Sequence, residues 1–206
     1  MCRALKRMQL KSEEKARQAY KPKPYVAAEY PGQKVQIDVK YVPGYCVAGE
    51  VKYYQYTAID EYSRLVYREM YDEHSTYSSR DFIRKAIAFF PFKIELVQTD
   101  NGTEWTKALI SNDPTPTLFE QELEKAGIMY KRIRVATPRH NGKVERQHRT
   151  DEKRFYKNMR MYSLEDGRKQ LKRYNRFSNT IPKVCLGYKS PNEVFSAYVK
   201  ANAEPR

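Results

Sequence analysis

The sequence predicts an α/β domain built on a five-stranded mixed sheet flanked by helices, and three observations support this fold class. Residues 34–70 contain three successive strand-like runs separated by turn signals. From residue 75 onward, helical runs alternate with short apolar runs of the kind that form buried strands. A basic segment with helical periodicity then continues to about residue 197. Consecutive strands favour antiparallel pairing and strands separated by helices favour parallel pairing, so the sheet should be mixed.

The composition indicates a folded, water-soluble protein. Of the 206 residues, 40% are hydrophobic, which is enough for one substantial core. No stretch approaches the roughly 18 consecutive apolar residues of a membrane span, and the N-terminus lacks the apolar centre of a signal peptide. The three cysteines, Cys2, Cys46 and Cys185, are too scattered for a disulfide framework or a zinc site. We therefore expect a cytoplasmic protein with no membrane partner.

The positive charge of the chain is concentrated in two blocks. The formal net charge is +14. Residues 1–24 contain eight basic and two acidic side chains, and residues 131–176 contain sixteen basic and five acidic ones. The rest of the chain is therefore mildly acidic. Such segregation favours a nucleic-acid partner over a uniformly solvated surface.

The first strand is the clearest element of the N-terminal third. Residues 1–30 should form a basic arm and linker. A basic helix fragment, either frayed or in contact with DNA, is followed by an extended linker at residues 21–24, where the prolines at 22 and 24 disfavour helix. From Lys34 the chain alternates, with apolar side chains on one face and Gln36, Asp38 and Lys40 on the other. Two further strands are expected at residues 51–59 and 64–70.

Helices and strands alternate beyond this point. Ser75 or Thr76 can cap a helix that runs to about Phe90, where Pro91 ends it. The following elements are expected to be a strand at 94–100, a helix at 118–126, a strand at 128–134, a helix from about 142 to Met161, a helix at 163–176 and a short helix capped by Ser190 and Glu193. This is the element order of a ribonuclease H-like domain with a C-terminal helical extension.

Three acidic residues fall where such a sheet would bring them together. Asp38 lies in the first strand, Asp100 ends the fourth, and Glu145 opens the helix after the fifth. The first and fourth strands are neighbours in a ribonuclease H-like sheet. Each residue also has an ordinary explanation: Asp38 as a solvated strand residue, Asp100 as a turn residue, and Glu145 as the surface partner of Arg149.

Carboxylates gathered in this way would suit divalent metal ions. Like charges at short range raise one another's pKa, and bound cations relieve the repulsion. Hard oxygen ligands suit magnesium or manganese, and two ions roughly 4 Å apart can assist an in-line displacement at phosphorus. We therefore expect Asp38, Asp100 and Glu145 to bind two Mg²⁺ ions, for which Mn²⁺ can substitute.

Basic side chains around Glu145 are candidates for holding a DNA backbone against that site. These DNA-binding candidates are Arg139, His140, Asn141, Lys143, Arg146, Arg149 and Lys153. His148 falls on the apolar stripe of the same helix, which favours a packed residue over a proton shuttle. Glu104 is either a peripheral metal ligand or a surface acid, and we expect the surface acid.

Three motifs together resemble the integrase core shared by retroviral integrases and bacterial insertion-sequence transposases. They are Gln36-Ile-Asp38, Gln98-Thr-Asp-Asn-Gly-Thr-Glu104 and Thr137-Pro-Arg-His-Asn-Gly-Lys-Val-Glu-Arg146, within a likeness that covers about residues 31–197. The segment Leu186-Gly-Tyr-Lys-Ser-Pro-Asn-Glu-Val194 is closer to the transposase branch. The resemblance implies a DDE-type, metal-dependent strand transferase with Asp38, Asp100 and Glu145 as its triad. It also implies double-stranded DNA partners (element ends and target), a homo-oligomer on DNA, and action at the bacterial nucleoid.

The chain departs from this family in two ways. Asp100 and Glu145 are separated by 44 residues, more than in the retroviral pattern, and the loop holding Pro114 and Pro116 can contain the excess at little entropic cost. No upstream helix-turn-helix region is visible, so we expect a fragment or a truncated reading frame, with residues 198–206 as a tail. The alternatives are a ribonuclease H-like nuclease that cuts without joining, and a DNA-binding protein that has lost catalysis.

Overall fold

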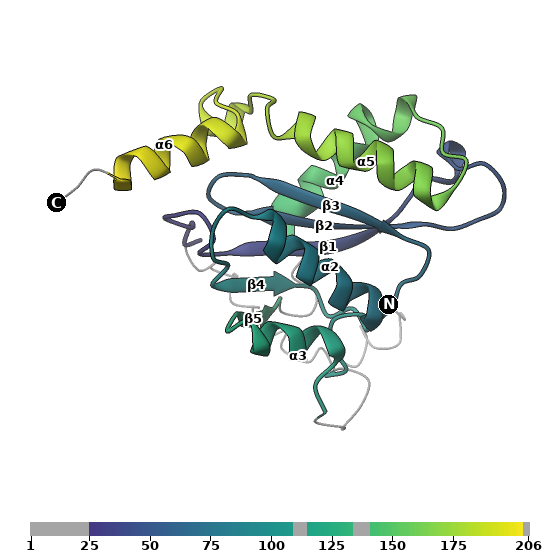
Figure 1. Ribbon diagram of the computed structural model, residues 1–206, viewed down its shortest axis with the longest axis horizontal. Helices are drawn as coiled ribbons and strands as arrows, with labels where there is room; N and C mark the ends of the chain where they lie inside the picture. The colour runs from purple at the N-terminus through teal and green to yellow at the C-terminus, as the bar shows by residue number, and fades with distance from the viewer. Residues whose placement is uncertain (1–24, 109–114, 134–140, 204–206) are drawn as a thin grey trace, which may run out of the picture.

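The computed structural model describes residues 25–108, 115–133 and 141–203. Its centre is a five-stranded sheet with the strand order β3-β2-β1-β4-β5 (Figure 1). The strands are β1 (Val35–Tyr41), β2 (Tyr54–Asp60), β3 (Val66–Tyr71), β4 (Leu96–Thr99) and β5 (Met129–Arg132). β2 pairs antiparallel with β1 and β3, whereas β4 pairs parallel with β1 and β5. The mixed sheet predicted from the sequence is therefore confirmed.

The second strand starts later than the sequence pattern suggested. We expected it to begin at residue 51, but Val51 is exposed and β2 begins at Tyr54. The reason is the pairing partner: Tyr54 lies opposite Tyr41, the last residue of β1, so the ladder ends there. A short 3-10 turn (Gly44–Cys46) belongs to the connection between the two strands.

Helices cover both faces of the sheet. α2 (Thr76–Phe89) and α3 (Leu118–Lys125) lie on one face, and α4 (Gly142–Arg154) and α5 (Leu164–Ser178) lie on the other (Figure 1). α6 (Pro191–Ala203) extends beyond the sheet, after a short 3-10 turn (Val184–Leu186). The main apolar core, between the sheet and α2 and α3, includes Ile37, Tyr56, Phe82 and Trp105. No helix in the described parts of the chain is long and apolar enough to cross a membrane.

The helix starts follow their capping signals. Ser75 caps α2 by accepting a hydrogen bond from the Ser78 amide, and Ser163 caps α5. The Ser190 and Glu193 pair closes reciprocally at the start of α6, as predicted. A second reciprocal box, between Thr117 and Glu120, opens α3 and was not foreseen. Side-chain oxygens thus satisfy backbone amides that a helix leaves unpaired.

The predicted end of α4 is wrong. We expected the helix to reach Met161, but it ends at Arg154 and a 3-10 turn (Tyr156–Asn158) follows. Phe155 and Tyr156 are adjacent in sequence and both buried, and they share a cluster with Met161. Adjacent residues point in different directions on a continuous α-helix. Leaving the helix at Phe155 lets these side chains enter the same core.

A buried polar group, the Arg68 cluster, joins β3 to α4 and α5. It is centred on Arg68 and Asp151, whose side chains are fully buried. The guanidinium makes two parallel hydrogen bonds to the carboxylate, of 2.7 Å from Nε and 2.9 Å from Nη2. The other members are Gln55, Gln147, Tyr174, Asn175 and Ser178. This bidentate pair fixes the position of α4 on the sheet.

The outer edge of β3 is bonded to side chains of α5 and of Asn179, the residue that follows it. Asn179 binds both backbone groups of Val66, accepting from its N–H at 3.0 Å and donating to its carbonyl at 2.9 Å. Asn175 donates to the carbonyl of Arg68 at 2.8 Å. The side-chain amides of Asn175 and Asn179 therefore take the place of hydrogen bonds that a further strand would make.

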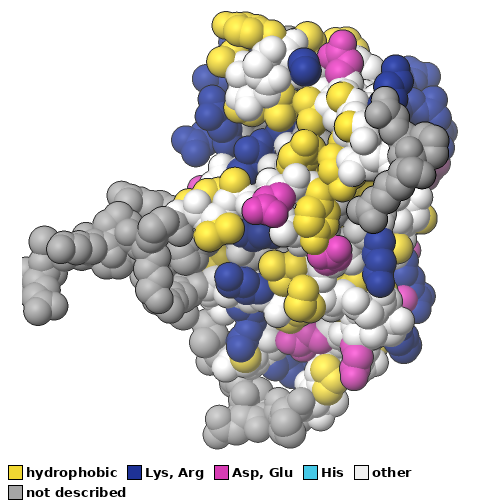
Figure 2. Space-filling model, turned by 90° about the vertical axis from the view of Figure 1, so that its left-hand side faces the viewer, with side chains coloured by type: hydrophobic (Ala, Val, Ile, Leu, Met, Phe, Trp, Pro, Cys, Tyr) yellow, Lys and Arg dark blue, Asp and Glu magenta, His cyan; other side chains and the backbone are white. Residues whose placement is uncertain are grey.

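The end of the molecule at which α6 lies has a mixed surface. Figure 2 shows hydrophobic side chains across the middle of this face and lysine and arginine side chains mostly toward its margins. The predicted basic arm, at residues 1–24, lies outside the described residues.

Candidate active site

Asp38 and Asp100 come from neighbouring parallel strands. In the ladder between β1 and β4, Val35 lies opposite Val97 and Gln36 opposite Gln98. The same register, continued two residues further, brings Asp38 level with Asp100. Asp100 directly follows β4, and one of its oxygens accepts a hydrogen bond of 3.1 Å from the Gly102 amide. The expected adjacency of the first and fourth strands is confirmed.

Glu145 enters the site from the first turn of α4. The Gln36 side chain fastens this turn to β1: its Oε1 accepts from the amides of Lys143 at 3.1 Å and Val144 at 3.3 Å. Gln36 is the strand residue two positions before Asp38. The start of the helix and the first strand therefore hold Glu145 and Asp38 in a fixed relation.

The acids perturb one another electrostatically. Burial is the main reason that the pKa of Asp38 is raised to about 7, and the negative charges of Asp100, Glu145 and Glu104 raise it further. Burial also raises the pKa of Asp100, with Glu104 adding to the effect. The positive charge of His74 lowers the Asp100 pKa only in part, so the net shift remains upward. The site therefore brings acidic side chains together beside the middle of β1 and the carboxyl end of β4.

The carboxylates are not gathered around a single point. Among the described residues, no group of three or more His, Cys, Asp or Glu side chains is arranged so that it could hold a metal ion. The donor chemistry nevertheless suits Mg²⁺, because Asp38, Asp100 and Glu145 carry carboxylate oxygens, which are hard ligands. The charges of Asp100 and Glu145 both raise the Asp38 pKa, so the three acids influence one another. The chain thus brings suitable donors to one region without a preformed coordination shell.

Glu104 belongs to the acidic site and is not the surface acid that we expected. It is only 5% exposed, and its Oε1 lies 2.8 Å from Nε2 of His74. A Cβ atom at Gly102 would meet the Glu104 carboxylate at 2.3–2.5 Å, so a glycine there leaves room for it. The hydrogen bond to Glu104 is the main cause of the raised pKa of His74. His74 stands alone between β3 and α2 in the sequence, without a motif that would have indicated this partnership.

His148 is packed, as expected, but its neighbours are polar. Its side chain is 11% exposed, with Nε2 at 3.1 Å from the Thr57 hydroxyl and Nδ1 at 3.5 Å from Asp38 Oδ2. Burial lowers the pKa of His148 to about 4. The imidazole is therefore neutral near pH 7 and lies against the acid without neutralising it.

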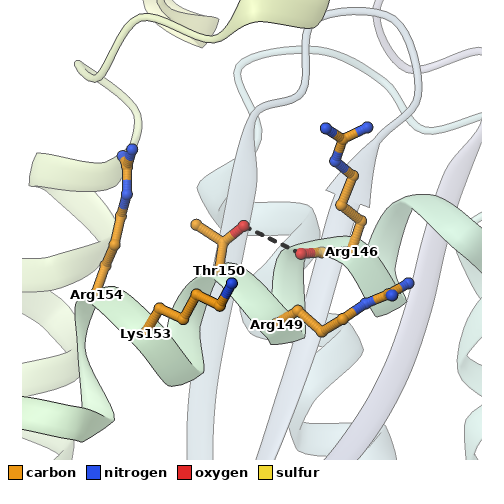
Figure 3. Close-up of a pocket in the computed structure, with 5 residues that line it drawn as sticks. All are labelled: Arg146, Arg149, Thr150, Lys153 and Arg154. Atoms are coloured by element: carbon orange, nitrogen blue, oxygen red, sulfur yellow. Dashed lines mark hydrogen bonds between the residues drawn. The ribbon is translucent and has the colours of Figure 1, made fainter.

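The solvent face of α4 carries exposed cations. Arg146, Arg149 and Lys153 line an open hollow of about 510 Å³ together with Thr150 and Arg154 (Figure 3). The four basic side chains fan out from one helix, and the Thr150 hydroxyl donates to the Arg146 carbonyl at 3.1 Å (Figure 3). Arg154 is an addition to the predicted set. No ion pair joins Glu145 to Arg149 in the described part of the chain, so the simple surface pair is not the arrangement found.

Two other predicted DNA contacts have partners within the protein. The ammonium of Lys143 lies 3.1 Å from Glu61 Oε2 and 4.2 Å from the centroid of the Tyr25 ring. Asn141 is 2% exposed and donates to the Ile37 carbonyl at 3.2 Å. In this structure the contacts of both side chains brace the start of α4. The remaining candidates, Arg139 and His140, lie outside the described residues.

Comparison with known proteins identifies relatives of the chain. Two family models, both described as integrase core domain, match residues 28–138 and 126–191. ORF3 of Spiroplasma virus SpV1-C74, a protein named as an integrase, is 34% identical over 128 residues, which cover 59% of this chain and 35% of that protein. The chain thus spans about a third of the length of this curated relative.

Solved structures share the fold at low identity. A chain of the simian T-cell lymphotropic virus intasome, in complex with the PP2A regulatory subunit B56 gamma, matches with a TM-score of 0.63 and 16% identity over 90% of this chain and 59% of that one. The HTLV-2 integrase catalytic core domain in complex with magnesium matches with a TM-score of 0.60 and 16% identity over 81% and 98% of the two chains. These likenesses confirm the ribonuclease H-like fold predicted from the element order.

Proposed function

Because the chain belongs to the integrase core domain family, we propose that it is the catalytic core of a DDE-type polynucleotidyl transferase that cuts and joins DNA. The observation that carries this proposal is the arrangement of the three acids: Asp38 and Asp100 come from the neighbouring parallel strands β1 and β4, and Gln36 of β1 holds the turn of α4 that bears Glu145. A cluster of mutually repelling carboxylates destabilises a fold unless a cation or substrate uses it. Its position beside the middle of β1 and the end of β4, next to the basic face of α4, suits a site that works on a phosphodiester.

Asp38, Asp100 and Glu145 are the proposed metal ligands, for two Mg²⁺ ions that Mn²⁺ can replace. Bound there, the cations would supply electrostatic stabilisation of charge developing on the phosphodiester oxygens. The magnesium in the HTLV-2 integrase core supports a divalent ion for this chain. Glu104 is paired with His74 and is not part of the proposed ligand set. Its charge raises the pKa of Asp100.

The protein's own groups position the reacting parts. Gln36 holds the first turn of α4 and hence Glu145, and the neutral His148 packs against Asp38. The exposed cations Arg146 and Arg149 would bind backbone phosphates, whose charge they complement. A water molecule would first break a phosphodiester and free a 3′-OH. This hydroxyl would then form a bond to a target phosphorus while the target strand's own 3′-oxygen leaves, so no covalent enzyme intermediate is needed.

We propose double-stranded DNA as the partner, both as element end and as target, with the protein acting as a homo-oligomer. The HTLV-2 core is described in trimeric and dimeric forms, which supports oligomerisation. The proposed place of action is the bacterial cytoplasm, on nucleoid DNA. The proposed extent of the core is residues 31–197.

Strand transfer in the presence of Mg²⁺ tests this function. Asp38→Asn and Glu145→Gln should each abolish joining of a labelled, pre-cleaved duplex end to a target duplex, while DNA binding and folding persist. Glu165→Gln, at an exposed acid of α5, is the matched control and should join at the wild-type rate. Full joining by Asp38→Asn would disprove the assignment. Cutting without joining of pre-cleaved ends would favour a ribonuclease H-like nuclease.

A further inference from the structure

Three aromatic rings form a stack that begins at the surface. Tyr41, the last residue of β1, is 64% exposed. Its ring lies 5.0 Å from that of Tyr54, its partner across the β1–β2 ladder. The Tyr54 ring in turn lies 5.3 Å from the His74 imidazole, and the two planes differ by only 19°. The outermost ring therefore presents a free aromatic face above two rings that are already stacked or tilted together.

The inner end of this stack reaches the acidic site. His74 is bound to Glu104 at 2.8 Å, and Glu104 lies in the loop that starts at Asp100. Tyr41 follows Asp38 by three residues on β1, about 10 Å along the strand and with its side chain on the opposite face, so the stack approaches the acids through His74 and Glu104. The rings thus stand within roughly one to two nucleotides of the proposed reaction centre.

We propose that Tyr41, Tyr54 and His74 form a stacking subsite for an unpaired nucleobase of the DNA strand that carries the reacting phosphodiester. This inference rests on the proposed function. An exposed tyrosine ring adds little to the core, whereas aromatic faces bind bases of any sequence because every base has a π-face. The fixed inner rings preorganise the outer one, which reduces the entropy lost when a base binds.

The occupant must be an unpaired base. Inside a duplex both faces of a base are covered by its neighbours, so a protein ring reaches a face only where the end frays or a nucleotide turns out of the helix. A subsite beside the reacting phosphodiester would hold such a nucleotide aside and favour DNA ends that open easily. The duplex beyond it would remain on the cations of α4.

The test is a binding measurement without divalent metal, so that no reaction occurs. Two duplexes are compared, one blunt and one with a short unpaired end that contains 2-aminopurine, whose fluorescence falls on stacking. Tyr41→Ala should weaken binding of the open-ended duplex about tenfold and abolish the additional quenching, with blunt-duplex binding unchanged. Tyr41→Trp should retain both. Tyr162→Ala removes a tyrosine that is 76% exposed, away from the stack, and should change neither.

Several outcomes separate the subsite from the proposed chemistry. Equal binding of the open-ended duplex by wild type and Tyr41→Ala would overturn the subsite, as would an equal loss for both duplexes. If wild type binds and quenches as expected but never joins DNA with Mg²⁺, the subsite is supported and the proposed function fails. Circular dichroism of Tyr41→Ala checks that the exposed replacement leaves the fold intact.

Discussion

Asp38, half-buried on β1, and Asp151, fully buried on α4, have opposite surroundings. Asp151 is fully buried, and although burial alone would raise its pKa, the Arg68 guanidinium and several hydrogen bonds lower it overall. The Asp38 side chain is 19% exposed, and burial together with neighbouring carboxylates raises its pKa to about 7. Burial acts to raise the pKa of both residues, so the opposite net shifts come from their partners: a guanidinium for Asp151 and further acids for Asp38.

This contrast separates a structural carboxylate from a functional one. The hydrogen bonds of the Arg68 cluster satisfy Asp151 within the fold, so nothing further is required there. The charge around Asp38 is left uncompensated by the described residues and is available to a cation. The same helix carries both arrangements, Asp151 near its end and Glu145 in its first turn.

The largest expected effect is the loss of stability on breaking the Arg68 cluster. Arg68→Met leaves the buried Asp151 charge without its partner and should lower the free energy of unfolding by about 3–5 kcal/mol. Urea unfolding measures the change. Arg173→Met, at an exposed position of α5, is the control and should shift it by less than about 0.5 kcal/mol. A loss no larger for Arg68→Met than for this control would show that the cluster does not hold the fold.

Removing a charge at the acidic site should not lower the free energy of unfolding, in contrast to the Arg68 cluster. Asp38→Asn removes one of the repelling charges and should leave stability unchanged or raise it by about 1 kcal/mol at pH 8, where Asp38 is ionised. Strand transfer should be lost in the same variant. Parallel urea unfolding of wild type and variant measures the difference. A loss comparable to that of Arg68→Met would place Asp38 among the structural carboxylates.

Asp38 and Asp151 should also contribute in opposite ways to the pH dependence of stability. The Asp38 pKa is higher in the folded protein than its ordinary value of 3.8, so its contribution is fully present below pH 3.8 and is lost as pH rises through about 7. The Asp151 pKa is lowered, so its contribution is present above the ordinary value and lost as pH falls below it. Unfolding free energies between pH 5 and 8 should therefore decline less steeply in Asp38→Asn than in wild type, by at most about 1.4 kcal/mol per pH unit. Identical slopes would contradict the raised pKa.

The smallest effect should come from the outer face of α4. Replacing Arg146 and Arg149 by glutamine should leave stability nearly unchanged and reduce the slope of log affinity for duplex DNA against log salt by about 1 per residue. Lys143→Gln, which removes a cation already paired with Glu61, should change that slope less. A titration of fluorescent duplex at several salt concentrations measures all three. Equal slopes for the Arg146 and Lys143 variants would remove the distinction between free and paired cations.

Local patterns were enough to predict the order of the elements. The alternation in β1, the Ser75 cap and the Ser190–Glu193 box each depend on residues close in sequence. The end of α4 could not be obtained in this way, because it is set by the cluster that takes up Phe155 and Tyr156 together. Helical periodicity continues past the point at which tertiary packing ends the helix.

The sequence predicted the elements that carry the proposed site residues, but not the partners that surround them. Element order placed Asp38, Asp100 and Glu145 in the elements where the structure has them. The His74–Glu104 pair joins residues 30 positions apart, and the partner of Lys143 is Glu61. Charge counts treat every lysine as available, whereas the structure shows which ones already have a carboxylate. Such pairings depend on the meeting of distant segments, which no local pattern encodes.

The side-chain amides along β3 also bear on how the protein behaves in concentrated solution. Open sheet edges are templates on which strands of other molecules can add and start aggregation. Asn175 and Asn179 already occupy the backbone groups of Arg68 and Val66 at one edge. The other edge, β5, has only four residues and ends in exposed lysine and arginine. Copies of this protein should therefore associate through helices or loops and resist strand-to-strand aggregation.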